Sequence, residues 1–294
     1  MKIEGMITAM VTPFHKDYTI HEEATKKLVE KLIADGVNGI FILGTNGEFQ
    51  SLSEKEKVAF ARLVVKIVNK RVAVYAGVGS CGTKLSIDLA NQMKEVGVDA
   101  VSVIAPYFQK LSDEALLLHY KTIAQQVDLP ILIYNIPSLT NNPISLAVVK
   151  ELSEIENIKG IKDSSGDFEN MRGYIEATKD KDFVVLAGSD SLILKALQAG
   201  AKGAVAATSN LLTKIDVAIY QNYLKNDFEA AKKAQDDIET LRSVNKLKIQ
   251  PVVLKHALKL SGYDVGEARL PLLPVSADDD IKIKEMLAYY KDQL

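Results

Sequence analysis

One lysine stands where a short apolar stretch of the chain ends. Lys162 follows the run 157–161 and precedes Asp163 and two serines. A lysine at the tip of a buried strand has to reach water or find a partner, because burial disfavours the charged ammonium. A lysine that is partly neutral attacks carbonyl carbons and forms Schiff bases with them. Lys162 is therefore the candidate nucleophile, and the other candidate residues are interpreted around it.

Two further groups at the ends of apolar runs can act beside such a lysine. Tyr134 lies at the end of the run 130–135. A tyrosine there can deliver a proton to a substrate oxygen, or it can be a core ring with a hydrogen-bonded hydroxyl. The turn 44–48 contains Thr45, Asn46 and Gly47, and backbone N–H groups in such a turn can bind a carboxylate. The alternative is an ordinary turn with its asparagine in a left-handed conformation.

Other candidate residues follow apolar runs in the same way. Tyr107 comes after the run 100–105, where an aromatic ring can line a pocket or simply pack. Gly188 ends the run 183–188, and Asp190 follows it closely. A nucleophile, a proton donor and a carboxylate-binding turn at predicted strand ends are together the equipment of a Schiff-base aldolase that acts on a 2-keto acid.

Eight short apolar runs alternate with longer amphipathic stretches. The runs are 5–11, 39–43, 72–77, 100–105, 130–135, 158–162, 183–188 and 203–207. Their composition is typical of strands buried on both faces, and stretches such as 21–35, 54–69 and 84–96 are predicted helices. The pattern predicts an α/β fold, a (β/α)8 TIM barrel, whose active site lies at the carboxyl ends of the strands. A doubly wound sheet is the alternative, but the Gly-rich motif 77–82 follows the third run instead of the first.

The alternation of strands and helices stops after residue 224. We predict a catalytic barrel domain over residues 1–224 and C-terminal helices over residues 225–294 that pack on the barrel. The predicted helices of this second part span 227–248, 251–261 and 279–291. Earlier in the chain, Ser53 and Glu56 have the spacing of a capping box at the start of the stretch 54–69.

Composition argues against several classes of function. The formal net charge is −2 without a strong basic patch, so neither nucleic acid nor an anionic membrane is an expected partner. No segment has the roughly 20 apolar residues of a membrane span. The single cysteine, Cys81, excludes an intrachain disulfide and a cysteine-based zinc site, and it fits a cytoplasmic protein. The four histidines lack the spacing of metal ligands, so no metal is expected.

Four motifs in order resemble those of the dihydrodipicolinate synthase / N-acetylneuraminate lyase family. They are the segments 44–48, 134–137, 160–164 and 188–190. The resemblance covers nearly the whole chain, including its C-terminal helices. It implies a (β/α)8 barrel, a covalent Schiff base between pyruvate and the enzyme in place of a cofactor, and a homotetramer built as a dimer of dimers.

The resemblance also implies roles for individual residues. Lys162 matches the Schiff-base lysine, Tyr134 the general acid/base, and Thr45 the hydroxyl that links this tyrosine to solvent or substrate. Thr45 and Asn46 match the residues that hold the pyruvate carboxylate. The remaining matches are expected to contact the substrate, and they are Ser164, Gly188, Asp190 and the backbone of Val205.

Two positions depart from the family pattern. Dihydrodipicolinate synthases usually place an arginine, which binds the carboxylate of the aldehyde substrate, where this chain has Leu139. A charge-assisted contact of that kind contributes roughly 1.5–3 kcal/mol. They also place a tyrosine from the neighbouring subunit where this chain has Phe108, although Tyr107 is adjacent and can substitute for it.

These departures favour a lyase that cleaves, or forms, a 2-keto acid from pyruvate and an aldehyde, with a 2-keto-3-deoxy sugar acid as substrate. Asn46 and Ala207 stand where hydroxyl residues occur in the sialic acid lyases, which argues for a smaller substrate than sialic acid. Three alternatives stay open. They are a dihydrodipicolinate synthase that condenses pyruvate with aspartate semialdehyde, an N-acetylneuraminate lyase, and a catalytically silent ligand-sensing barrel.

Overall fold

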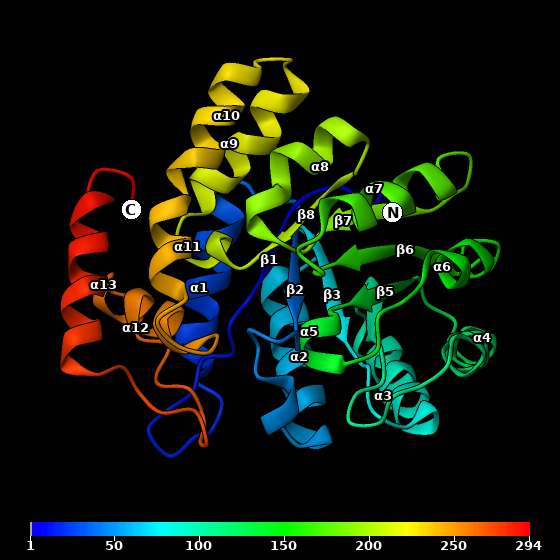
Figure 1. Ribbon diagram of the computed structural model, residues 1–294. Coiled ribbons are helices and arrows are strands. Elements are labelled where there is room, and N and C mark those ends of the chain that lie inside the picture. Colours follow the sequence, from blue (N-terminus) through cyan, green and yellow to red (C-terminus); the bar gives the residue numbers. More distant parts are fainter. Residues whose placement is uncertain (1) are drawn as a thin grey trace.

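A closed barrel of parallel strands forms the centre of the molecule (Figure 1). The computed structural model describes residues 2–294, and over that range eight strands pair in sequence order, with β8 returning to β1. The strands are β1 Gly5–Ala9, β2 Gly39–Ile42, β3 Ala73–Gly77, β4 Ala100–Ile104, β5 Ile131–Asn135, β6 Ile158–Asp163, β7 Val184–Ala187 and β8 Gly203–Ala206. Each lies within, or one residue beyond, an apolar run of the sequence, so the predicted (β/α)8 barrel is confirmed.

Helices cover the outside of the barrel, as the amphipathic stretches predict. They are α1 Glu22–Ala34, α2 Glu54–Val68, α3 Thr83–Val96, α4 Asp113–Gln126, α5 Pro137–Thr140, α6 Leu146–Leu152, α7 Phe168–Thr178, α8 Ile193–Ala199 and α9 Thr213–Leu224, with 3₁₀ turns at Phe49–Ser51, Asp190–Leu192 and Thr208–Asn210. The predicted capping box forms, because the Ser53 side chain accepts from Glu56 N–H while the Glu56 carboxylate accepts from Ser53 N–H. Gly97 and Gly200 end α3 and α8 in the left-handed conformation that glycine adopts without strain.

The apolar core has two parts, one on each face of the barrel sheet. The larger part lies between the strands and the surrounding helices. The smaller part fills the barrel interior and includes Ile7, Phe41, Tyr75, Leu132 and Leu186. Because side chains alternate across each strand, every second residue contributes to this inner layer. The barrel is therefore packed inside, and a site at its mouth has a rigid apolar floor.

The Gly-rich motif 77–82 has a packing role in this fold. A Cβ atom on Gly77 would lie 2.1 Å from the Leu43 carbonyl oxygen, and one on Gly79 would lie 2.5 Å from the Ile104 nitrogen. Neighbouring backbones come so close at both positions that only glycine fits. Close approach of β3 to β2 and β4 thus accounts for these two glycines.

The C-terminal segment adds four helices beside the barrel (Figure 1). They are α10 Phe228–Asp237, α11 Glu239–Asn245, α12 Val252–Leu260 and α13 Ala277–Tyr289. In Figure 1, α13 forms the outer edge of the molecule, and α11 and α12, which both contact α13, lie between it and the barrel. α10 packs against α9 and α8. No helix among residues 2–294 is long and apolar enough to cross a membrane.

The structure corrects one helix prediction in this segment. The stretch predicted as a single helix over 227–248 is divided between α10 and α11. The Tyr290 hydroxyl donates to the Asp237 carbonyl at 2.6 Å and accepts from the Leu241 N–H at 3.1 Å. It therefore occupies the place of the i→i+4 hydrogen bond between those two groups, and a side chain inserted into this ladder breaks or bends a helix.

Candidate active site

Strand register places the two principal candidate residues side by side. Tyr134 on β5 is paired with Lys162 on β6, so their side chains leave the sheet on the same face. The Lys162 Nζ lies 4.1 Å from the centre of the Tyr134 ring and 4.9 Å from the centre of the Phe41 ring. Because Phe41 belongs to the inner core, the lysine stands directly above the packed barrel interior.

Lys162 is buried but forms no ion pair with the described residues. Its exposed fraction is 4%, and among residues 2–294 no carboxylate lies within 4.0 Å of its Nζ, nor does this atom form a hydrogen bond. The other fully buried lysine, Lys255, is paired with a carboxylate. No ion pair or hydrogen bond among the described residues therefore occupies the Lys162 Nζ, so a carbonyl carbon of a ligand can approach it.

The Tyr134 hydroxyl is held by a second hydroxyl group. The Thr45 Oγ1 lies 3.3 Å from the Tyr134 Oη, and either atom can be the donor. Thr45 comes from the turn after β2 and is half-buried, whereas Tyr134 has an exposed fraction of 4%. The pair forms a short path along which a proton can move between the buried tyrosine and the outer part of the site.

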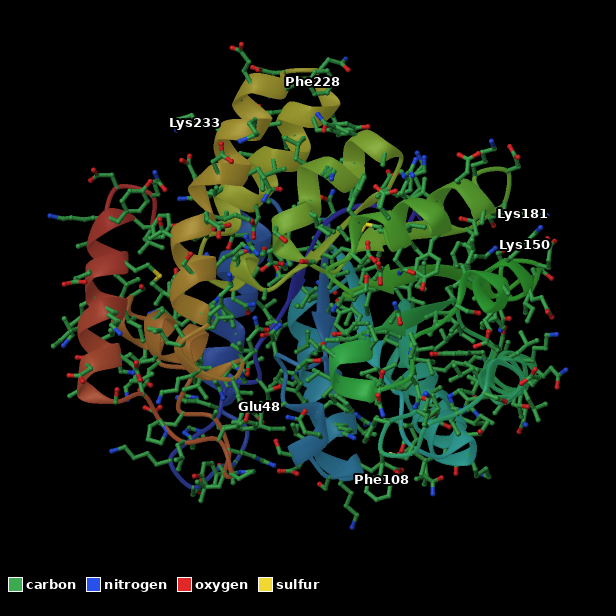
Figure 2. The ribbon with its side chains drawn as sticks, in the orientation of Figure 1. Glu48, Phe108, Lys150, Lys181, Phe228 and Lys233 are labelled. Atoms are coloured by element: carbon green, nitrogen blue, oxygen red, sulfur yellow. The ribbon has the colours of Figure 1, made fainter. Side chains whose placement is uncertain are left out.

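The turn 44–48 is anchored from beneath by a buried ion pair. The Glu48 carboxylate lies 2.7 Å from the Lys255 Nζ and accepts the Arg269 N–H at 2.8 Å. Glu48, which is labelled in Figure 2, and Lys255 are both fully buried. Glu48 has φ +55°, a left-handed conformation that is uncommon for a residue other than glycine. The C-terminal segment therefore fixes the turn that carries Thr45 and Asn46.

A cavity of about 420 Å³ opens above these residues. Nine of the residues predicted from sequence line it, and they are Thr45, Asn46, Tyr134, Leu139, Lys162, Ser164, Gly188, Asp190 and Val205. Asn46 is almost fully buried, and its Oδ1 has no hydrogen-bond partner among the described residues. A buried amide oxygen without a partner is unfavourable, so this position is suited to a ligand that supplies the missing contact.

Two predicted residues do not line the cavity. The Gly47 carbonyl accepts a hydrogen bond from Thr12 at 2.7 Å, and a Cβ on Gly47 would lie 3.0 Å from the Leu43 nitrogen. Gly47 thus faces the inside of its turn. Tyr107 packs its ring edge-to-face against Phe49, with ring centres 6.1 Å apart. Neither residue lines the cavity of its own chain, so the substrate contacts of Gly47 and Tyr107 remain predictions, and the contact of Tyr107 would be made to the site of a neighbouring subunit.

Gly188 leaves space for the lysine side chain. A Cβ at this position would lie 2.1 Å from the Ser164 Oγ and 3.0 Å from the Lys162 Cε. The Ser164 hydroxyl donates to the Gly188 carbonyl at 3.1 Å, which joins the ends of β6 and β7. Any larger residue at position 188 would therefore displace Ser164 and the lysine stem.

The Asp190 carboxylate accepts hydrogen bonds from the backbone around it. Its two carboxylate oxygens accept the N–H groups of Ala207 at 3.2 Å and Thr208 at 3.0 Å. Burial raises the pKa of Asp190, while those two N–H groups and, to a smaller extent, the charge of Arg242 oppose the shift. Asp190 lines the cavity, and it also ties the loop after β7 to the loop after β8.

Several lining residues escaped the sequence analysis. They come from α11 and the segment after it, and they are Arg242, Asn245, Lys246, Lys248, Ile249 and Gln250. In sequence the first four belong to the predicted helix 227–248, which has no motif, and the other two follow it. Nothing in the sequence indicates that this part of the chain meets the mouth of the barrel. Among the described residues no three His, Cys, Asp or Glu side chains gather into a potential metal site.

Comparison with known proteins gives a consistent result. The model of the dihydrodipicolinate synthetase family matches residues 2–289. The chain is 33% identical to a 4-hydroxy-tetrahydrodipicolinate synthase of Methanosphaera stadtmanae, over 98% of each chain. It is 40% identical to a crystal structure of dihydrodipicolinate synthase from Bacillus anthracis, with a TM-score of 0.95 over 98% of each chain. A third structure, 28% identical with a TM-score of 0.95 over 99% of this chain and 98% of the other, is described as a monomeric dihydrodipicolinate synthase variant.

Proposed function

This chain belongs to the dihydrodipicolinate synthetase family, and from that premise we propose that it joins pyruvate to aspartate semialdehyde through a Schiff base on Lys162. The resemblance stated from the motifs is confirmed at the level of the family, and with it the class of pyruvate-dependent lyases. The expected closer relation to the sugar-acid branch is not supported, because the relatives compared here carry synthase names.

One observation supports the chemistry more than any other. The Lys162 amine faces the cavity without an ion pair, beside a tyrosine hydroxyl that another hydroxyl holds at 3.3 Å. The amine adds to C2 of pyruvate, and water leaves to give an iminium. Loss of a proton from C3 then gives an enamine, so the enzyme needs no organic cofactor as an electron sink.

Tyr134 serves the carbon–carbon bond step. C3 of the enamine attacks the aldehyde carbon, and the aldehyde oxygen takes the proton of the Tyr134 hydroxyl. Thr45 can return a proton to the tyrosine through their mutual contact. The iminium that results is attacked by the amino group of aspartate semialdehyde, which closes a ring and releases the Lys162 amine. If water attacks this iminium instead of the amino group, the same steps describe an aldolase. An aldolase that cleaves its substrate follows them in reverse.

A second candidate function rests on one residue. Leu139 lines the cavity and cannot pair with a carboxylate, which favours an aldehyde without one, such as that released from a 2-keto-3-deoxy sugar acid. Neither an N-acetylneuraminate lyase nor a silent ligand-sensing barrel is favoured by a specific contact in the site. A homotetramer and a cytoplasmic location remain predictions.

Borohydride trapping tests the shared chemistry. The protein is incubated with pyruvate, reduced, digested and analysed by mass spectrometry. We expect a pyruvate adduct on Lys162, and none on Lys162→Ala. A missing adduct, or one on another lysine, would refute the mechanism.

Competition between substrates tests the choice of aldehyde. Consumption of aspartate semialdehyde in the presence of pyruvate is compared with pyruvate release from a panel of 2-keto-3-deoxy sugar acids. We expect the larger kcat/KM for aspartate semialdehyde. The opposite ranking would establish the sugar-acid aldolase instead, with the Schiff base retained.

A further inference from the structure

We propose that Arg242, Asn245 and Lys246 form the binding site for the carboxylate of the aldehyde substrate. The proposal rests on the proposed function, and it identifies the cationic contact that Leu139 does not provide. The three residues are spaced i, i+3 and i+4 along α11 and its end, so their side chains lie on one face of the helix. All three line the cavity that contains Lys162.

Asn245 is the clearest sign of a ligand at this face. Its exposed fraction is 8%, and its Oδ1 has no hydrogen-bond partner among the described residues. Buried polar groups are normally hydrogen-bonded, and an unsatisfied one needs an explanation. This oxygen needs a hydrogen-bond donor, which a carboxylate does not supply. The other end of the amide, Nδ2, forms no hydrogen bond within the described residues, and its two N–H groups can donate to a carboxylate in the cavity.

Arg242 and Lys246 add the charge that such a ligand needs. Arg242 is mostly buried and pairs with Glu239 through one nitrogen, which leaves other donors of its guanidinium free for the cavity. Lys246 is exposed, and no carboxylate lies within 4.0 Å of its Nζ in the part of the chain that the structure describes. A cation near the end of a helix also stabilises the helix dipole, but that role does not require Arg242 or Asn245 to line the cavity.

The charge balance of the cavity lining leads to the same conclusion. Besides Lys162, three basic side chains line it, namely Arg242, Lys246 and Lys248, against the single carboxylate of Asp190. That carboxylate already accepts two backbone N–H groups, and Lys248 is paired with Asp279 at 3.1 Å. Lys246 is thus a cation without a carboxylate partner among the described residues, and Arg242 keeps guanidinium donors beyond its pair with Glu239, so both can contact a second anionic group besides the carboxylate of pyruvate.

The arrangement distinguishes between the two classes of substrate. A 2-keto-3-deoxy sugar acid has one carboxylate, the one expected at Thr45 and Asn46. Aspartate semialdehyde brings a second carboxylate, several bonds away from the reacting carbon. The basic residues of α11 that line the cavity match that second group, and the sugar acid does not require them. α11 therefore supplies the contact to the substrate carboxylate that an arginine at position 139 would supply in the family pattern.

Steady-state kinetics with substitutions on α11 tests this site. Arg242→Gln and Lys246→Gln are compared with Lys233→Gln, which removes one positive charge from α10 at the periphery of the molecule (Figure 2). We expect KM for aspartate semialdehyde to rise about 10- to 100-fold in Arg242→Gln and less in the exposed Lys246→Gln. KM for pyruvate and the trapped adduct on Lys162 should stay unchanged in both, and Lys233→Gln should behave as the unaltered enzyme.

Ionic strength supplies a readout that a purely structural role would not affect. Added salt should raise KM for aspartate semialdehyde in the unaltered enzyme, and this dependence should be weaker in Arg242→Gln. Normal KM values for aspartate semialdehyde in both α11 variants, with the adduct formed, would overturn the α11 site alone. A missing adduct in the unaltered enzyme would instead refute the proposed function. Failure of the α11 site and failure of the proposed function therefore give different results.

Discussion

At the scale of single residues, the site depends on which side chains stand at paired positions of two neighbouring strands. Tyr134 and Lys162 are register partners on β5 and β6, and their side chains share the barrel interior with Phe41. The amine and the hydroxyl are therefore fixed by the sheet instead of by flexible loops. A substitution that removes only the hydroxyl should separate proton transfer from formation of the Schiff base.

For Tyr134→Phe we expect the pyruvate adduct on Lys162 to form, although more slowly, while turnover falls about 10²–10⁴-fold. The ring is conserved in this variant, so packing against Phe41 and Lys162 is kept. Trapping with borohydride and steady-state assay of the same preparation measure the two effects. Thr45→Val serves as the comparison, and its loss should be smaller because the tyrosine proton is still present. Full turnover in Tyr134→Phe would exclude the acid/base role.

Lys162 and Tyr134 could be predicted from the sequence because each stands at the end of an apolar run, and parallel strands in a barrel bring their ends to one rim, where the structure places both beside the cavity. Sequence reasoning did not identify Arg242 or Asn245, since their position over the cavity depends on how α11 packs on the barrel. It could not show that Gly47 and Tyr107 stand outside the cavity lining, because a position after a strand does not determine which way a loop residue points.

At the scale of elements, the C-terminal segment controls the turn after β2. Glu48 and Lys255 are 207 positions apart in sequence, yet they form a fully buried ion pair. No local pattern indicates such a contact. The Arg269 N–H also binds Glu48, so three separate parts of the chain meet beneath Thr45 and Asn46.

Removal of one member of this pair should be costly. Lys255→Met leaves the Glu48 carboxylate buried without its partner, and we expect about 3–5 kcal/mol lower free energy of unfolding. The double variant with Glu48→Gln should recover part of that loss, because the uncompensated charge is removed. Lys259→Met, which removes the exposed pair with Glu267, should change stability by only about 0–1 kcal/mol. Urea unfolding measures all three, and equal losses for Lys255→Met and Lys259→Met would contradict the assignment.

A second contact between elements makes stability depend on pH. His119 on α4 is buried, its Nδ1 lies 2.9 Å from the Thr83 Oγ1 of α3, and its Nε2 has no partner among the described residues. Burial lowers the pKa of His119 from 6.5 to about 4. Between these values the unfolded chain binds a proton that the folded protein does not, so stability falls as the pH decreases from about 6.5 to about 4.

The expected loss between pH 7 and pH 5 is about 2 kcal/mol from this residue. Urea unfolding at both pH values, on the unaltered protein and on His119→Gln, isolates the contribution. Glutamine does not titrate, so the variant should lose about 2 kcal/mol less over this interval, whatever its stability at pH 7. Parallel pH dependence of the two proteins would show that His119 is protonated in the folded state.

At the scale of the whole molecule, eight apolar runs with clear boundaries were enough to predict the barrel. Strands buried on both faces have a simple signature, and their order in a closed barrel follows from the alternation with helices. The C-terminal helices were predicted as an addition to the barrel, and the division at residue 224 remains a prediction. Their contribution to the cavity and the break caused by Tyr290 could not be predicted, because both depend on contacts between distant segments.

Phe108 is a candidate contact of the expected homotetramer. Phe108 is 93% exposed, it has φ +81°, and Figure 2 shows it at the edge of the molecule. In a monomer this residue carries two costs. Its apolar ring is exposed to water, and its backbone has an unfavourable conformation. A neighbouring subunit that covers the ring would supply the compensation.

We therefore expect the unaltered chain to be a tetramer and Phe108→Asp to form smaller species, as measured by light scattering after gel filtration. Phe108→Gly is the matched variant, because glycine accepts the positive φ but loses the ring. The Phe108→Gly tetramer should also dissociate if the ring makes the contact. The folded subunit should become more stable, because the strain at this position is relieved. A tetramer that persists in both variants would place the interface elsewhere. A monomer in the unaltered chain would group this protein with the relative described as a monomeric variant.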